Sequence, residues 1–235
     1  MSEQVTIARR FCGPPDSGNG GYVCGVLASF VDGPAEVTLR APPPLEHALT
    51  VERLDGGGAA LRDGDDIVAE ASPATFDVEV PAPVDIATAQ EAARHSLALD
   101  DKSPFRTCFV CGSQRDESDG LRIFPGLVDG PTTVAAPWTP DASLADDRGF
   151  VRPEFVWAAL DCPSGFGTGF GPETLAVLGK LAAKAVTPVE VGRRYVVMGW
   201  SLGSEGRKLY GGSALFAEDG ALCAYARATW VMLRK

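Results

Sequence analysis

The sequence predicts an α+β protein in which two antiparallel sheets are each wrapped around one long buried helix. Two observations lead to this prediction. Residues 19–30 and 153–161 are apolar on nearly every side and begin with helix-start signals, which is typical of buried helices. Each stretch lies among consecutive segments that alternate apolar and polar residues, as half-buried strands do. Strands in a run around a single buried helix indicate α+β architecture.

The first half begins with a short strand-like segment at residues 5–10 and a loop rich in glycine and proline. The helix at 19–30 follows, with Ser17 or Asn19 available to cap it. Four alternating segments then predict strands at residues 35–40, 48–54, 59–62 and 67–71. The last two flank an Asp-Gly turn and therefore predict a hairpin.

The second half repeats this order without obvious sequence identity. Residues 81–83 have linker composition, and residues 86–99 have the composition of a connecting helix. Strands are predicted at 121–124 and 132–136 before the second buried helix, and at 175–186, 193–202, 208–217 and 221–233 after it. We therefore divide the chain into a first half at 1–85, a connecting segment at 86–104 and a second half at 105–235.

The second buried helix contains the most unusual polar residue. Pro153 stands at its first position. The backbone N–H at that position makes no hydrogen bond within a helix, so proline is tolerated there. Pro163 predicts that the helix ends near Asp161, because the residue before a proline is driven out of the helical region. A carboxylate at the C-terminus of a buried helix is unfavourable both to the helix dipole and to desolvation. A residue that is unfavourable in both ways is a candidate for function.

Charge and composition restrict the partners. The chain has 235 residues, 45% of them hydrophobic and 22% charged, which fits a protein with a substantial core. A formal net charge of −10 argues against nucleic acid and anionic membranes as partners. The acidic excess lies in residues 1–104, with seven basic and 17 acidic side chains, so an anionic ligand would be better received by the balanced second half. No apolar run approaches membrane-span length and no leader segment is evident, so a cytoplasmic location is expected.

The six cysteines are expected to be reduced in a protein of this kind. Cys108 and Cys111 form a CxxC pair that would suit half of a zinc site. The sequence has no second CxxC, and only His47 and His95 are available, so a structural role is favoured. No metal and no other cofactor is predicted.

Three short motifs, in this order along the chain, resemble the hotdog-fold thioesterase superfamily in a tandem, or double-hotdog, arrangement. Asn-Gly-Gly at 19–21 is similar to the start of the hotdog helix. Cys-Phe-Val-Cys-Gly at 108–112, followed by Gly-Leu-Arg at 120–122, is similar to a segment that opens many hotdog proteins. Trp-Ala-Ala-Leu-Asp at 157–161, with Gly165, resembles the end of that helix, where many members have an acidic residue.

The resemblance to phenylacetyl-CoA-type thioesterases implies an active site between two hotdogs. One helix start offers N–H groups to the thioester carbonyl, and the acid of the other helix activates water or attacks the carbonyl. The position nine residues after Asn19 is Ala28, whereas Asp161 follows Arg152 by nine. Each half therefore lacks what the other supplies. We predict one composite site of Asn19, Gly20, Gly21 and Asp161, and a second, inert cleft containing Arg152-Pro153-Glu154 and Ala28.

Further residues are weaker candidates. The resemblance places Ser164 and Thr168 where a hydroxyl orients the water or the carbonyl. Arg193 and Arg194 are candidates for the phosphates of coenzyme A, although charged strand ends are usually only solvated. The alternative for Asp161 is that it binds N–H groups of the following turn. The alternative for Asn19 and its glycines is an N-cap and close packing.

The predicted function is hydrolysis of an acyl-CoA or another acyl thioester. A helix N-terminus suits the negative charge that develops on the carbonyl oxygen, and an acid desolvated in an apolar helix suits activation of water. The first alternative is a non-catalytic acyl or acyl-CoA binding module. A dehydratase on the same fold is disfavoured because neither predicted buried helix contains a histidine that could pair with an acidic residue. A single chain supplies both halves, so catalysis should not require a homodimer, although one is compatible with this architecture.

Overall fold

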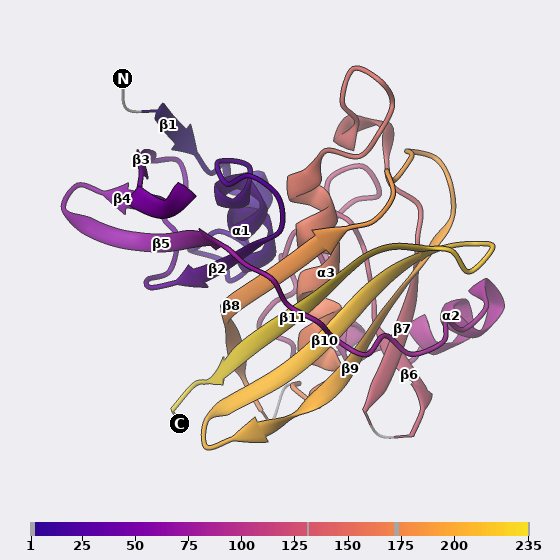
Figure 1. Cartoon of the computed structure of the whole chain (residues 1–235). Helices are drawn as coiled ribbons and strands as arrows, with labels where there is room; N and C mark the ends of the chain where they lie inside the picture. Colours follow the sequence, from indigo (N-terminus) through magenta and orange to yellow (C-terminus); the bar gives the residue numbers. More distant parts are fainter. Residues whose placement is uncertain (1–2, 131, 172–173, 235) are drawn as a thin grey trace.

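The protein, described by a computed structural model at residues 3–130, 132–171 and 174–234, is built on one antiparallel sheet (Figure 1). Its helices are α1 (Gly20–Ala28), α2 (Ile86–Ala93) and α3 (Pro153–Phe166). The strands are β1 (Glu3–Thr6), β2 (Ala35–Leu39), β3 (Ala48–Arg53), β4 (Ala59–Asp63), β5 (Asp66–Pro73), β6 (Gly126–Asp129), β7 (Thr133–Trp138), β8 (Ala176–Ala185), β9 (Tyr195–Glu205), β10 (Lys208–Ala217) and β11 (Leu222–Met232).

The strands follow the order β1-β3-β4-β5-β2-β8-β11-β10-β9-β7-β6, which makes an 11-stranded sheet within the described residues. The expected division into two sheets is therefore wrong. The first-half strand β2 pairs antiparallel with the second-half strand β8, from Ala35 opposite Ala183 to Thr38 opposite Lys180. Two separate sheets would each have an edge strand with a row of unpaired backbone N–H and C=O groups. The pairing of β2 with β8 provides hydrogen-bond partners for the groups of both edges.

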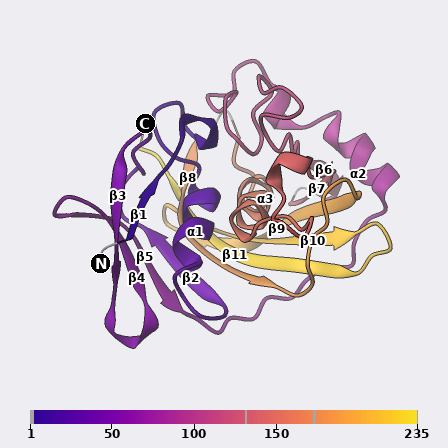
Figure 2. The same cartoon turned by 90° about the horizontal axis from the view of Figure 1, so that it is seen from above.

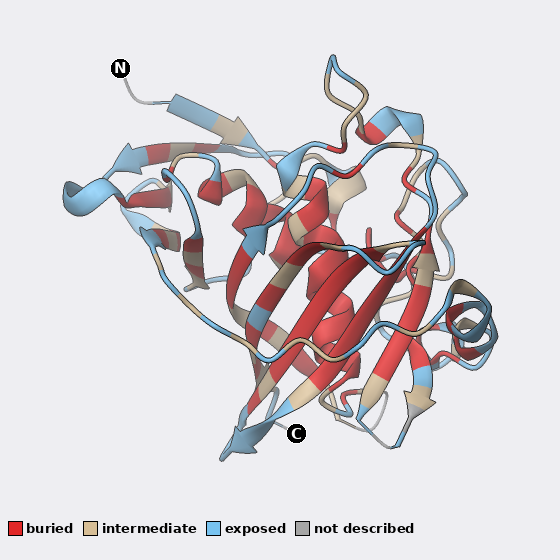
Figure 3. Cartoon of the chain, turned by 45° about the vertical axis from the view of Figure 1, so that its right-hand side comes forward, coloured by how far each residue is buried: buried red, intermediate tan, exposed pale blue. Residues whose placement is uncertain are grey.

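The two buried helices lie side by side within the curve of the sheet (Figure 2). Helix α1 packs on β2, β4, β5 and β8, whereas α3 packs on β7 to β11. The central strands are buried and the outer ones more exposed (Figure 3). The strands of each half thus cover mainly the helix of that half, β8 contacts both helices, and the helices meet where the two halves join.

Glycines set the distance between α1 and α3. A Cβ atom at Gly21 would lie 2.4 Å from the Cβ of Asp161, and one at Gly25 would lie 2.6 Å from the Cα of Glu154. These two glycines are one helical turn apart, so they form a smooth strip on α1. The strip allows the backbone of α1 to contact α3. The start of α1 therefore lies directly against Asp161.

Helix α3 continues to Phe166, so the prediction that it ends near Asp161 is wrong. Pro163 is accommodated inside the helix, where it removes one backbone hydrogen bond. The last turn packs directly on β9 and β10. A Cβ at Gly199 would lie 1.9 Å from the Pro163 carbonyl oxygen, and one at Gly211 would lie 2.2 Å from that of Ser164. This close packing offsets the lost hydrogen bond. Asp161 therefore lies within the helix, and only the desolvation part of the sequence argument applies to it.

The connecting segment also differs in detail from its prediction. Helix α2 ends at Ala93, and a short 3₁₀ turn follows at Leu97–Leu99. Residues 121–124 do not form a strand, because the strand at this place, β6, begins at Gly126. Helix α2 packs on β6 and β7. None of the helices in the described part of the chain is long and apolar enough to cross a membrane.

Candidate functional site

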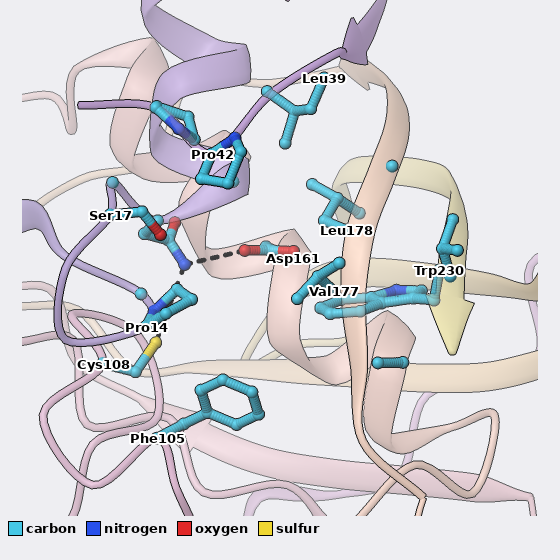
Figure 4. A pocket seen from close by; sticks show the side chains of 18 of the residues that line it. Pro14, Ser17, Leu39, Pro42, Phe105, Cys108, Asp161, Val177, Leu178 and Trp230 are labelled. Carbon is cyan, nitrogen blue, oxygen red and sulfur yellow. Dashed lines mark hydrogen bonds between the residues drawn. The ribbon is translucent and has the colours of Figure 1, made fainter. Parts of the chain in front are cut away.

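A pocket of about 510 Å³ lies where the two halves meet (Figure 4). The N-terminus of α1, the start of β8 and the end of β11 form its walls, together with the loops that follow β2 and precede β6. Most of its lining is apolar and includes Leu39, Phe105, Phe170, Leu178 and Trp230. Asp161 is an ionisable side chain in this surface, and Figure 4 shows its carboxylate joined by a hydrogen bond to the start of α1.

Asp161 is bound by the start of α1. Its Oδ2 atom accepts a hydrogen bond of 2.8 Å from the Asn19 side-chain amide and one of 3.0 Å from the Gly21 backbone N–H. The other end of the Asn19 amide, Oδ1, accepts from the Tyr22 N–H at 2.9 Å and caps α1. Asn19 therefore both starts one helix and holds the carboxylate of the other. The structure brings together Asn19, Gly20, Gly21 and Asp161, as the composite site requires.

The second carboxylate oxygen of Asp161 has different surroundings. Asp161 is only 2% exposed, and its Oδ1 is buried without a hydrogen-bond partner among the described residues. Burial raises the pKa of Asp161 to about 7, because desolvation of the charge outweighs the hydrogen bonds from Gly21 and Asn19, and the nearby Cys108 raises it further. A buried carboxylate oxygen without a partner, in the wall of a pocket, is suited to accept a proton from a bound molecule.

The glycines at the start of α1 have separate roles. The N–H of Gly21 is occupied by Asp161, so it is not free for a ligand. Gly20 is half-buried and lines the pocket, and its N–H has no hydrogen-bond partner in the described part of the chain. An unpaired N–H in the first turn of a helix is a site for a negatively charged or carbonyl oxygen.

The hydroxyl residues predicted to act on the substrate lie outside the pocket lining. The Ser164 hydroxyl donates to the Asp161 backbone carbonyl at 2.6 Å and accepts from the Trp230 indole N–H at 2.9 Å. The Thr168 hydroxyl donates to the Gly165 carbonyl at 2.7 Å. Ser164 thus ties α3 to a side chain of the pocket wall, and Thr168 closes the end of the helix.

The structure does not bring Arg193 and Arg194 to the pocket. They pair with Glu190 and Glu218 respectively. They directly precede Tyr195 of β9, which is paired with Ala217 at the C-terminal end of β10. The pocket residue Trp230 is paired with Leu209, near the N-terminal end of β10. The two arginines and the pocket therefore lie at opposite ends of β10. The arginine that does line the pocket is Arg40, whose exposed side chain pairs with Glu70 at 2.6 Å.

The sequence analysis missed a cluster of cysteines in the same pocket. Cys162 directly follows Asp161, and α3 brings it to the CxxC pair. The sulfur atoms of Cys108, Cys111 and Cys162 all lie within 4.8 Å of one another, and all three residues are buried. Besides the CxxC pair itself, the sequence signal for this cluster is that Cys162 is adjacent to the predicted catalytic residue.

A second, smaller pocket of about 280 Å³ lies at the start of α3, as the first lies at the start of α1. Its lining includes Pro153, Val156, Trp157 and the loop that follows β8. Pro153 stands at the first helical position and has no N–H to donate. At this pocket Pro153 therefore offers no counterpart of the Gly20 N–H, and Arg152, Glu154 and Ala28, which were also expected in the second cleft, are not part of its lining.

Solved structures share the architecture of this chain at low sequence identity. A Lactobacillus plantarum protein with a provisional assignment as an oleoyl thioesterase has a TM-score of 0.61 at 13% identity, over 100% of this chain and 96% of that one. The tesB protein of Mycobacterium avium subspecies paratuberculosis has a TM-score of 0.60 at 13% identity, over 92% and 88%. A hotdog-fold protein of unknown function from Alicyclobacillus acidocaldarius has a TM-score of 0.60 at 8% identity, over 99% and 93%.

No protein-family model and no curated protein sequence matches the chain. The structural similarity extends over nearly the whole length of the proteins compared, so the chain has the hotdog fold found in proteins named as thioesterases. Likeness at this identity concerns the fold alone, and the function has to be argued from the site.

Proposed function

We propose that this protein is an acyl-CoA thioesterase with a single composite site, to which α1 contributes Asn19 and Gly20 and α3 contributes Asp161. The observation that carries the proposal is the buried carboxylate of Asp161. One of its oxygens is held by the other half of the chain, its second oxygen is buried without a partner among the described residues, and the residue lines an apolar pocket. A buried carboxylate oxygen without a hydrogen-bond partner lowers the stability of a fold, so stability alone does not explain its presence.

The reaction follows from this arrangement. The thioester carbonyl oxygen accepts a hydrogen bond from the Gly20 N–H, which stabilises the negative charge of the tetrahedral intermediate. Asp161 Oδ1 takes a proton from a water molecule as that water attacks the carbonyl carbon. The carbon–sulfur bond then breaks, and the thiolate leaves and takes up the proton. The products are a free acid and a thiol. In a second route, Asp161 attacks the carbonyl directly and expels the thiolate, and water then hydrolyses the resulting mixed anhydride to the same acid while the thiolate takes up a proton from that water.

The lining of the pocket favours an apolar acyl group. Phe170 stacks on Trp230 with ring centroids 5.2 Å apart, and Phe105 lies edge-on to Phe170. Leu39 and Leu178 add aliphatic surface. Arg40 is exposed at the same pocket and is the residue we assign to a phosphate of coenzyme A, in place of Arg193 and Arg194.

A non-catalytic acyl-binding module is the second candidate. The observation that favours it is the near-complete burial of Asp161. The hydrogen bonds of its carboxylate with Asn19 and Gly21 connect α3 to α1, so the residue also has a structural role. The two candidates differ in turnover: a binding module retains a thioester without releasing thiol.

The test is thiol release from short, long and aromatic acyl-CoAs, with the wild type and Asp161→Asn side by side. We expect turnover to fall by roughly 10²–10⁴-fold in Asp161→Asn, the usual contribution of a general base, with acyl-CoA binding retained. Asp32→Asn changes an exposed aspartate and is the matched control. Equal turnover in the wild type and Asp161→Asn would exclude Asp161 as the catalytic group. Tight binding of an acyl-CoA with no turnover would favour the binding module.

A further inference from the structure

Three buried thiols meet in the wall of the main pocket, and the proposed hydrolysis does not use them. Cys108 and Cys111 come from the loop that follows the connecting segment, and Cys162 comes from α3. Their sulfur atoms lie within 4.8 Å of one another, and those of Cys108 and Cys162 are 3.9 Å apart. No disulfide joins them.

The spacing suits a thiophilic metal ion. Zinc binds thiolates at about 2.3 Å in tetrahedral geometry, which places two sulfur ligands of one ion about 3.8 Å apart. The separation of Cys108 and Cys162 is close to that value, and a CxxC pair with a distant third cysteine is a common ligand set for zinc. Three thiolates are soft ligands, so the same set does not suit magnesium or calcium.

Two features around the sulfurs also point to a bound ligand. The Asn19 amide lies 3.8 Å from the Cys108 sulfur and donates toward it, as outer groups do to a metal-bound thiolate. The carboxylate of Asp161, the residue next to Cys162, has one buried oxygen without a partner among the described residues. All three cysteines and Asp161 line the pocket, so a fourth coordination position would be accessible from it.

We propose that Cys108, Cys111 and Cys162 together bind one zinc ion, with its fourth coordination position open to the acyl pocket. Binding converts the three thiols to thiolates and releases their three protons. The open position takes water or a thiol such as the product of thioester hydrolysis. This site does not rest on the proposed function, because the hydrolysis is derived without a metal, although Asn19 and Asp161 adjoin both.

The test measures metal directly, apart from activity. The protein is stripped with a chelator under reducing conditions and titrated with Co²⁺, whose thiolate complexes absorb in the near ultraviolet. We expect one Co²⁺ per chain with a thiolate charge-transfer band, which zinc displaces stoichiometrically. Cys108→Ser, Cys111→Ser and Cys162→Ser should each lose the band. Cys223→Ser, a buried cysteine of β11 outside the cluster, should keep it.

A second measurement on the wild type does not depend on whether the variants fold. Zinc should protect Cys108, Cys111 and Cys162 from alkylation relative to the stripped protein, while the other three cysteines react equally in both states. A wild type that shows no cobalt band would overturn the proposal, and so would a Cys108–Cys162 disulfide found by mass spectrometry. Metal binding without thiol release from any acyl-CoA would leave this site standing and exclude only the thioesterase.

Discussion

At the scale of single residues, the site depends on the two ends of one amide group. Asn19 is only 2% exposed. Its oxygen caps α1 through Tyr22, and its nitrogen holds Asp161. An aspartate would cap the helix equally well but would present a second negative oxygen to Asp161, so asparagine is the residue that satisfies both contacts.

Substitutions of Asn19 separate its two contacts. Asn19→Ser keeps a capping hydroxyl but loses the hydrogen bond to the Asp161 carboxylate, so the free energy of unfolding should fall by about 1.5–3 kcal/mol. Because Asp161 is then no longer held in position, turnover should fall roughly 10- to 100-fold. Asn19→Ala should lose the same turnover and a further 1 kcal/mol or so of stability. Urea unfolding and acyl-CoA turnover measure the two effects. Full turnover in Asn19→Ser would contradict the role assigned to the amide.

Ser164 is expected to act on stability rather than on chemistry. Ser164→Ala leaves the buried Trp230 indole N–H without its partner, so the free energy of unfolding should fall by about 1–3 kcal/mol. We expect turnover to change much less than in Asp161→Asn. Thermal unfolding and turnover are measured together, and Thr168→Ala serves as the comparison because its hydroxyl bonds only to the local Gly165 carbonyl. A loss of turnover at full stability would favour the role in orienting water that the family resemblance implies.

At the scale of elements, the site exists because α1 and α3 approach closely. The glycine strip of α1 permits this approach, and the glycines of β9 and β10 hold the last turn of α3. Packing thus decides the length of α3, since the helix continues through Pro163 where local rules predict its end.

Gly21→Ala tests this packing. Alanine usually stabilises a helix relative to glycine by about 0.5–1 kcal/mol. Here its Cβ would lie 2.4 Å from the Cβ of Asp161, so overpacking should reverse the sign and reduce the free energy of unfolding by about 1–3 kcal/mol. Turnover should fall as well, because the Gly21 N–H would be displaced from Asp161. Urea denaturation of the variant measures the sign, and an increase in stability would show that the helices are not in close contact.

At the scale of the whole molecule, one chain contains the complete composite pocket. Pairing of β2 with β8 joins the halves, and Glu36 of β2 accepts a hydrogen bond of 2.7 Å from Lys180 of β8. The proposed catalytic group, Asp161, and the start of α1 that binds it come from different halves of the same chain.

Activity should therefore not depend on association between chains. We expect the specific activity to stay constant when the protein is diluted from micromolar to nanomolar concentration, whether or not a homodimer forms. Light scattering at each concentration reports the oligomeric state. A specific activity that falls together with the dissociation of a dimer would show that a second chain completes the site.

The sequence by itself determined most of the order of the elements and predicted that Asn19, Gly20, Gly21 and Asp161 lie together. Alternating segments placed most strands correctly, because half-buried strands must alternate, and the complementary gaps at Ala28 and Arg152 paired Asn19 with Asp161. Only the tertiary structure decided the rest. The single sheet depends on the pairing of β2 with β8, and the cysteine cluster depends on α3 continuing past Asp161. Both arise from contacts between residues far apart in the chain, and local sequence patterns do not encode such contacts.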